Sequence, residues 1–322
     1  MDSTRRALVA AAALVLPLSA AAQARFPDRP ITLIVPFAPG GVADLTARAV
    51  AEAMAKSLGQ AVVVDNRPSA GSIVATAAVA KAAPDGHTLL LMSNSNALSA
   101  SLFKKLPFEV TRDFAPISTL AFFDLGVFVA ASSRFNQLGD VIAAAKAQPG
   151  KLTAGTIAVG STQQLSAELF KTVAGVELLV VPYKSSPAVL TALRAGEIDV
   201  AFEIVAPMLG QLGGGTVRAL ALMGETRHPA LRDVPTAKEA GLARYTVASW
   251  NALAAPAGTP AAVVERLNRA VREALETKTV QDRLAPLGVH LRAGTPDQLQ
   301  ALLVSEIRRW AEVIRVAKIE PE

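Results

Sequence analysis

Short apolar runs alternate with amphipathic stretches along most of the chain. Near the start, continuous apolar segments predict three strands covered on both faces, at residues 31–37, 61–65 and 88–93. Residues 44–58 place apolar side chains at three- and four-residue spacing, and Gly59 follows them, which predicts a helix. A second helix is predicted over 72–82. Strands that alternate with helices are typical of a parallel α/β sheet.

The same alternation restarts further along the chain. It predicts strands at 125–131, 152–157, 178–182, 200–204 and 217–223, and helices at 138–148 and 164–173. A last strand is predicted at 250–255, followed by two amphipathic helices. The first begins at Thr259 and Pro260, and the second begins at Thr295, which would form a capping box with Gln298. The pattern therefore predicts two α/β units of similar build.

The first 24 residues have the composition of an export signal. Arg5 and Arg6 precede an apolar run over 7–18, and the sequence AQA at 22–24 fits a small-x-small cleavage site. A membrane-spanning helix needs about 20 residues, and this run is shorter. We therefore expect residues 1–24 to be removed near Ala24 and the protein to lie outside the cytoplasm, not embedded in the membrane. The secretory route is favoured over the twin-arginine route, which stays open.

Size and composition narrow the classes of protein. The roughly 300 residues after the signal exceed what one hydrophobic core usually serves, which predicts two domains. The chain contains no cysteine, so disulfides and cysteine-bound metals are excluded. The net charge is +5, but basic residues are spread along the chain and aromatic residues make up only 5%. We therefore expect no nucleic-acid partner, because such surfaces show a basic stripe or stacking aromatic residues.

Common catalytic and nucleotide-binding motifs are absent from the sequence, including G-x-S-x-G, H-E-x-x-H, the P-loop and G-x-G-x-x-G. His87, His228 and His290 each stand alone in turn-like sequence, which favours loop or surface histidines over bases or metal ligands. We expect no catalytic residue, no cofactor and no metal. A small hydrolase stays open as an alternative, because spatial partners of Ser72 or Ser161 are not visible in a sequence.

The most informative loop is PFAPGGVAD at residues 36–44, between the first predicted strand and helix. Several backbone N–H groups at a helix start have no partner inside the helix. Together with the helix dipole they can hold a carboxylate or a phosphate without a charged side chain. In the alternative interpretation the glycines only permit a tight turn, and Asp44 only caps the helix.

Five further polar loops lie at predicted strand ends or helix starts, at residues 66–72, 93–96, 160–163, 183–186 and 202–203. In open α/β sheets, ligands bind beyond the carboxyl ends of the strands. Polar loops from two similar halves therefore favour a cleft between two domains. Arg67 and Lys184 are the cations in these loops, and we expect both to be structural or surface residues rather than ligand-facing ones.

Eight short motifs occur in order: PDRPI at 27–31, PFAPGGxxD at 36–44, NRP at 66–68, AKAAPDG at 80–86, LFKKLPF at 102–108, VPYK at 181–184, DVPT at 233–236 and APAGTP at 255–260. With these motifs the chain resembles the Bug-type receptors, the periplasmic substrate-binding proteins of tripartite tricarboxylate transporters. The resemblance implies a two-lobed, periplasmic-binding-protein type II fold, in which each lobe is a mainly parallel sheet flanked by helices. It places residues 25–123 and 246–322 in lobe 1, residues 124–245 in lobe 2, and the ligand cleft between them.

The resemblance also implies a set of ligand-binding residues, because in that family the loop matching 37–44 grips a carboxylate through backbone N–H groups and ordered water. The set is Phe37, Ala38, Gly40, Gly41, Asp44, Ser69, Ser72, Asn94, Ser95, Ser161, Thr162, Gln163 and Glu203. Asp44 would repel an anion, so we expect it to orient N–H groups or water rather than touch the ligand. The chain departs from the family pattern at Ser69, Ile73, Asn96 and Glu203, among others, so the resemblance leaves the rest of the ligand open.

Together these features predict a monomeric periplasmic receptor, not an enzyme. It would capture a small carboxylate between its lobes and deliver it to the membrane permease subunits of a tripartite tricarboxylate-type transporter. The ligand could be a mono-, di- or tricarboxylate, an acidic amino acid or an aromatic carboxylate. A periplasmic co-sensor that signals to a membrane kinase is the main alternative, and a small cleft hydrolase is a less favoured one.

Overall fold

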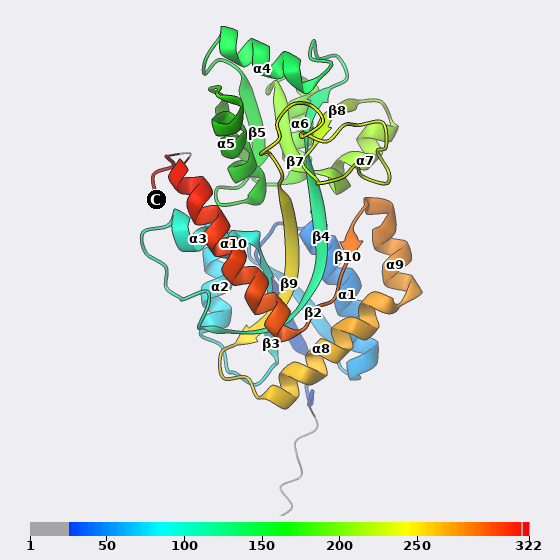
Figure 1. Cartoon of the computed structure of the whole chain (residues 1–322). Helices are drawn as coiled ribbons and strands as arrows, with labels where there is room; N and C mark the ends of the chain where they lie inside the picture. Colours follow the sequence, from blue (N-terminus) through cyan, green and yellow to red (C-terminus); the bar gives the residue numbers. More distant parts are fainter. Residues whose placement is uncertain (1–25, 317, 322) are drawn as a thin grey trace, which may run out of the picture.

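One continuous sheet runs through both lobes of the protein. The computed structural model describes residues 26–316 and 318–321, so the predicted signal at 1–24 lies outside the described residues. The strand order is β2-β1-β3-β9-β4-β7-β5-β6, and β8 and β10 also pair with β4. Figure 1 shows the sheet running through both lobes, with helices packed around it.

Lobe 1 is built on five strands and the first part of a sixth. The five are β1 (Ile31–Val35), β2 (Val62–Asn66), β3 (Thr88–Ser93), β9 (Ala248–Pro256) and β10 (His290–Leu291). Its helices are α1 (Val42–Leu58), α2 (Ile73–Ala80), α3 (Asn94–Leu102), α8 (Ala261–Glu276), α9 (Lys278–Leu284) and α10 (Pro296–Val316), with the 3-10 turns η1 (Ala70–Ser72) and η2 (Ala285–Leu287).

Lobe 2 has a similar arrangement. Its strands are β5 (Thr153–Ile157), β6 (Leu179–Tyr183), β7 (Val200–Ile204) and β8 (Val217–Leu222). Its helices are α4 (Leu138–Ala147), α5 (Thr162–Ala174), α6 (Ser186–Ala195) and α7 (Val205–Gly213). Each lobe has one parallel trio, β2-β1-β3 in lobe 1 and β6-β5-β7 in lobe 2. The prediction of two α/β lobes is confirmed, and antiparallel pairs made by β4 and β9 join the two trios.

The strand β4 (Phe114–Ala130) belongs to both lobes. From Phe114 to Asp124 it pairs with β9, and from Leu125 onward it pairs with β7 and β8. The sequence predicted only the second part of it. Pro116 and neighbouring hydroxyl side chains interrupt the apolar pattern of the first part, and the register shifts just after Pro116, as in a β-bulge. Because the sheet is continuous, the residue boundaries of the lobes stay a prediction.

Four helices escaped the sequence prediction, namely α3, α6, α7 and α9. The start of α3 looked like a polar loop, but Ser93 caps it in a capping box with Asn96, and both side chains are buried. The helix α7 follows β7 without an intervening residue. No loop residues therefore mark that boundary in the sequence.

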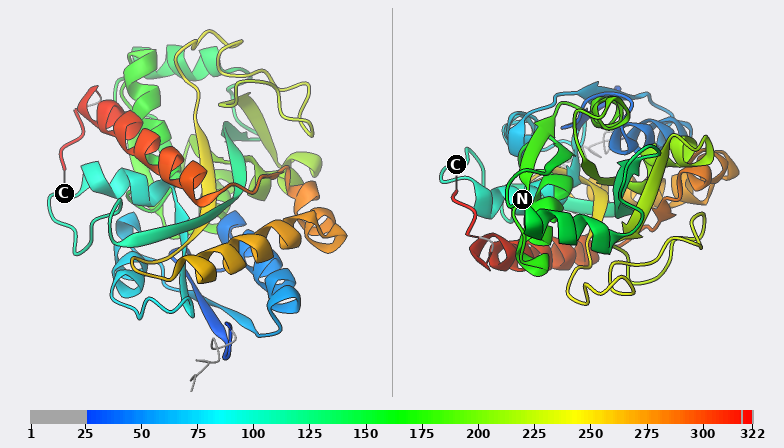
Figure 2. Two further views of the ribbon diagram at one scale, coloured as in Figure 1. Left: turned by 60° about the horizontal axis from the view of Figure 1, so that its bottom comes forward. Right: turned by 90° about the horizontal axis from the view of Figure 1, so that it is seen from above.

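The predicted apolar faces form the core. The α1 stripe is buried, and so are Leu299, Leu303, Trp310 and Ile314 on α10. The apolar side chains of Leu302 and Ile307 on the same helix are only partly buried. The helices α8 and α10 both contact β4, and Figure 2 (left) shows them crossing the same side of the molecule. Among the described residues, every helix is too short or too polar to cross a membrane.

Replacing Trp310 with alanine should lower the free energy of unfolding by about 3–5 kcal/mol, because it empties a large buried volume on α10. Trp310 is fully buried, and its indole N–H donates to Glu306 at 2.9 Å. Val316→Ala on the same helix removes an exposed side chain and should change stability by about 0.5 kcal/mol or less. Denaturant unfolding of both variants measures the difference, and similar losses would contradict this account of α10.

Candidate functional site

A cleft of about 570 Å³ lies between the two lobes, at the ends of the strands. Lobe 1 lines it with the loop after β1, the segment from Pro68 to Ser72, Ser93 and Ser95 beside the start of α3, and Ser249 and Asn251 of β9. Lobe 2 lines it with the loops that lead into α5 and α6 and with Ile204 at the end of β7. The predicted position of the site between two sets of strand ends is therefore where the structure has its cleft.

The loop between β1 and α1 is held from behind by one carboxylate. Asp44 is 2% exposed and accepts hydrogen bonds from the Gly40 N–H at 3.0 Å, the Arg48 side chain at 3.0 Å and the Asn66 amide at 2.9 Å. Asn66 also donates to the Phe37 carbonyl at 3.0 Å. Burial alone would raise the pKa of Asp44, but the hydrogen bonds from Arg48, Gly40 and Asn66 outweigh it and lower the pKa.

Lobe 2 has the same arrangement of a glycine N–H and a side-chain acceptor at the start of α5. The Gly160 N–H donates to the Gln164 side chain at 3.0 Å, four residues later, as the Gly40 N–H does to Asp44. Both glycines have positive φ, +75° and +84°, which other residues rarely adopt. The loops at Gly41 and Ser161 that begin α1 and α5 both border the cleft, and so does Ser186, the first residue of α6. The starts of α1, α5 and α6 therefore border one space, together with Ser93 and Ser95 at the start of α3, and the free N–H groups of helix starts suit an anion.

The two lobes touch beside the cleft. The Gly71 N–H donates to the Val159 carbonyl at 3.0 Å, and the hydroxyls of Thr162 and Ser249 lie 3.2 Å apart. A Cβ atom on Gly160 would lie 2.9 Å from the Gly71 Cα, so two glycines allow the backbones to meet. The structure thus has the lobes in contact around the cleft.

Charged side chains contribute little to the lining. Among the described residues that line the cleft, Lys184 is the one cation, and none is Asp, Glu or His. Lys184 is exposed, as expected, but it lies at the cleft rather than away from it. Arg67 is exposed and pairs with Asp65 at 2.7 Å, in keeping with its expected surface role. The Asn251 amide nitrogen is buried without a partner in the described part of the chain, so the lining also holds an unused donor.

The structure brings most of the predicted site residues to the cleft wall: Phe37, Ala38, Gly41, Ser69, Ser72, Ser95, Ser161, Thr162 and Gln163. Gly40, Asp44, Asn94 and Glu203 are not part of that wall. Asn94 is fully buried and donates to the Ala248 carbonyl at 2.9 Å, while Asp44 lies behind its loop, as expected. Contact of any of these residues with a ligand stays a prediction.

Several residues that line the cleft were not predicted from the sequence. Lys184, Ser185 and Ser186 follow β6 in a loop that was noticed but not selected. Phe123, Ser249 and Asn251 lie inside long strands, where nothing local marks them as site residues. Only the pairing of β9 with β3 and β4 brings its residues beside the loops of lobe 1.

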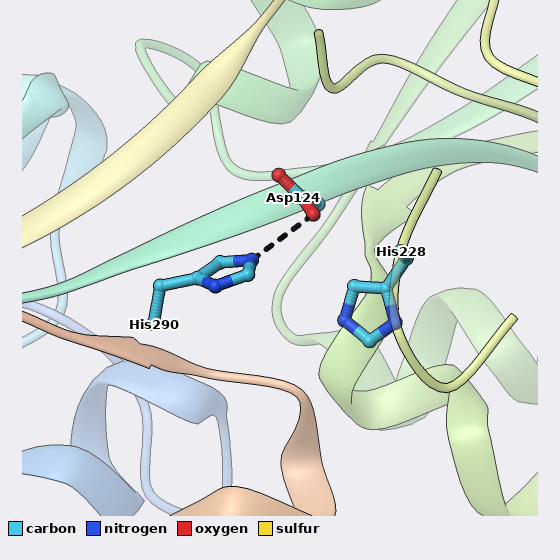
Figure 3. A group of neighbouring side chains, drawn as sticks. All are labelled: Asp124, His228 and His290. Carbon is cyan, nitrogen blue, oxygen red and sulfur yellow. Dashed lines mark hydrogen bonds and ion pairs between the residues drawn. The ribbon is translucent and has the colours of Figure 1, made fainter. Parts of the chain in front are cut away.

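Asp124, His228 and His290 form a separate cluster outside the cleft lining (Figure 3). Their potential ligand atoms lie within 4.8 Å of one another, and His290 contacts Asp124 at 3.3 Å. His228 is buried, and its ring nitrogens contact the Gly288 carbonyl at 3.1 Å and the Ala230 N–H at 3.2 Å. Because the backbone occupies both nitrogens, we interpret the cluster as a structural contact that joins the loop at His228 to β10.

The model of a family described as "Tripartite tricarboxylate transporter family receptor" matches residues 46–319. The chain belongs to this family. The resemblance inferred from the sequence motifs is therefore confirmed.

Three similar proteins support the assignment. Protein BugT of Bordetella pertussis is 37% identical over 309 residues, which cover 95% of this chain and 94% of BugT. The solved structure of the periplasmic binding protein BugD has a TM-score of 0.87 and 30% identity, covering 92% of this chain and 100% of BugD. The structure of R. palustris Rpa4515 with adipate has a TM-score of 0.88 and 34% identity, with the same coverage of each chain. Members of this family are binding receptors of the periplasm, not enzymes.

Replacing Asp44 with alanine should destabilise the protein by about 1–3 kcal/mol at neutral pH, because three donors lose their acceptor. The lowered pKa of Asp44 means that its contribution is present above the ordinary value of 3.8 and is lost as the pH falls through the folded-state pKa. Denaturant unfolding at several pH values should therefore show the difference from wild type shrinking in acid. The exposed residue Asp233 offers a control, since Asp233→Ala should have little effect.

Proposed function

We propose that this protein captures a small organic carboxylate between its lobes and presents it to the permease of a tripartite tricarboxylate-type transporter. The observation that carries the proposal is the cleft itself, which the starts of α1, α5 and α6 border, and whose described lining residues include one cation and no anion. Such a site favours an anion that can accept several hydrogen bonds. The chain belongs to a family of periplasmic receptors, and one relative was solved with adipate. Both facts support a carboxylate ligand over other anions.

The two lobes would hold the ligand from opposite sides. Asp44 holds the loop before α1 through the Gly40 N–H, and Gln164 holds the loop before α5 through the Gly160 N–H, so the other N–H groups of both loops would be available to the ligand. Asn251 and Lys184 would add further donors. A ligand that contacts both lobes favours the closed arrangement over an open one, because its affinity for the two states differs.

The export signal and the boundaries of the lobes are also part of the proposal. Residues 1–24 would act as the export signal and be removed near Ala24, since family members are periplasmic binding proteins. Residues 25–123 and 246–322 would form one lobe and residues 124–245 the other. The change of β4 partners between Asp124 and Leu125 supports that division.

A carboxylate should stabilise the protein against heat. A panel of malate, adipate, citrate, aspartate and benzoate covers the ligand classes, and a ligand at about 100 times its dissociation constant adds about 2.7 kcal/mol. Thermal-shift measurements with the purified protein test this, with adipamide as the uncharged match to adipate. If no member of the panel raises the melting temperature, the proposed function is wrong.

Lys184→Gln should weaken binding of the panel carboxylate that gives the largest shift. Losing one hydrogen bond from a charged but exposed side chain costs about 1–2 kcal/mol, or roughly 5–30-fold in affinity. Added salt should weaken binding to wild type more than to the variant, because screening acts on the removed charge. Lys151→Gln, an exposed position in lobe 2, should bind like wild type. Titration calorimetry measures the three affinities. An unchanged affinity of Lys184→Gln would show that Lys184 does not contact the ligand.

A further inference from the structure

Glu203 lies directly behind the cleft wall, at the carboxyl end of β7, and is fully buried. One carboxyl oxygen, Oε1, accepts hydrogen bonds from the Gln163 amide at 2.6 Å and from the Ile204 N–H at 2.7 Å. The other, Oε2, is buried and has no partner in the described part of the chain. Gln163 and Ile204 both line the cleft, so a single residue separates this carboxyl group from the ligand space.

The surroundings of Glu203 provide no compensating charge. Gly126 lies opposite it on β4, Gln163 faces it from α5, and Ser186 is close to it at the start of α6. Charged groups on the surrounding elements are engaged elsewhere. Asp124 on β4 contacts His290, and Asp199 before β7 accepts from Thr153. Within the described residues, neither these groups nor Lys184 acts on the titration of Glu203.

These surroundings favour the neutral acid. Burial raises the pKa of Glu203, and the hydrogen bonds from Gln163 and Ile204, together with the nearby Ser186 hydroxyl, offset this only in part. An ionised carboxylate here would leave Oε2 as a buried, unpaired charge, which is costly. A protonated Oε2 instead leaves a neutral O–H group there, which costs far less to bury than a charge. The Ser186 hydroxyl lies near Glu203 but is not at hydrogen-bond geometry with Oε2 in this structure.

We infer that Glu203 is a positioning residue that acts in its neutral, protonated form: it holds the Gln163 amide and the Ile204 N–H at the cleft wall without placing a negative charge behind the bound anion. This inference rests on the proposed function. If Glu203 were ionised, its negative charge would lie one residue behind the bound anion, where little water screens the repulsion. Anion binding and the neutral form of Glu203 therefore favour each other, and affinity falls as Glu203 ionises.

The test is the dissociation constant of the panel carboxylate with the largest thermal shift, measured by calorimetry from about pH 6 to about pH 8.5. Wild-type affinity should fall with rising pH, by up to about tenfold per pH unit where Glu203 ionises. Glu203→Gln keeps an acceptor and an N–H donor without a titrating proton, so its affinity should stay close to the low-pH wild-type value throughout. Glu197→Gln, the same change at an exposed position of lobe 2, should keep the wild-type slope.

Unfolding without ligand gives a second readout. A raised carboxyl pKa means that the stabilising effect is complete below the ordinary value of 4.5 and is lost as the pH rises through the folded-state pKa. The wild type should therefore lose stability relative to Glu203→Gln as the pH rises. If that variant fails to fold, the wild-type slope still decides.

The outcomes separate the two proposals. Binding with the same affinity at every pH, or a slope that Glu203→Gln retains, would overturn the role of Glu203 and leave the receptor function intact. If no panel carboxylate binds at any pH, the receptor function fails and this inference fails with it.

Discussion

Both lobes share the strand β4, and the geometry of the cleft depends on that continuity. The strand pairs with β9 in lobe 1 and with β7 and β8 in lobe 2, so each lobe is hydrogen-bonded to the same backbone. The ends of β1, β3, β5, β6 and β7 are thereby brought toward one space from two sides. Helices α8 and α10 pack on β4 and support it.

Within the cleft, backbone groups rather than charged side chains provide most of the electrostatic potential. Asp44 and Gln164 act through the loops they hold, each accepting from a glycine N–H four residues earlier. An acid near an anion site is thus compatible with binding, because the Asp44 charge is paired with Arg48 and satisfied by donors on the far side of its loop. Glu203 differs from Asp44, since no cation contacts it and its Oε2 has no partner among the described residues.

In the proposed receptor, two sets of groups would have different tasks. The backbone donors of the loops would recognise a carboxylate, whereas the side chains around them would set the size and polarity of the ligand. Here those side chains include Phe123, Tyr183 and Lys184.

Local signals in the sequence made many features of this protein predictable. The spacing of apolar residues marked most strands and helices, because burial on one face or two leaves a fixed period in the sequence. The loop at 36–44 and the role of Asp44 were predictable because a helix start and its cap lie within a few residues of each other. Family motifs then identified the receptor class, which the comparisons confirm.

Other features depended on pairing between distant segments. The first part of β4 and the helix α7 lacked a clear local pattern, and Asn251 became a site residue only because β9 pairs beside β3. Lys184 joined the cleft because the lobes face each other there. The sequence alone thus determined most of the elements, the loop that leads into α1 and the family, since these depend on neighbours in the chain. The tertiary structure decided which side chains share the cleft and which acid is buried unpaired, since burial and charge pairing depend on residues far apart in sequence.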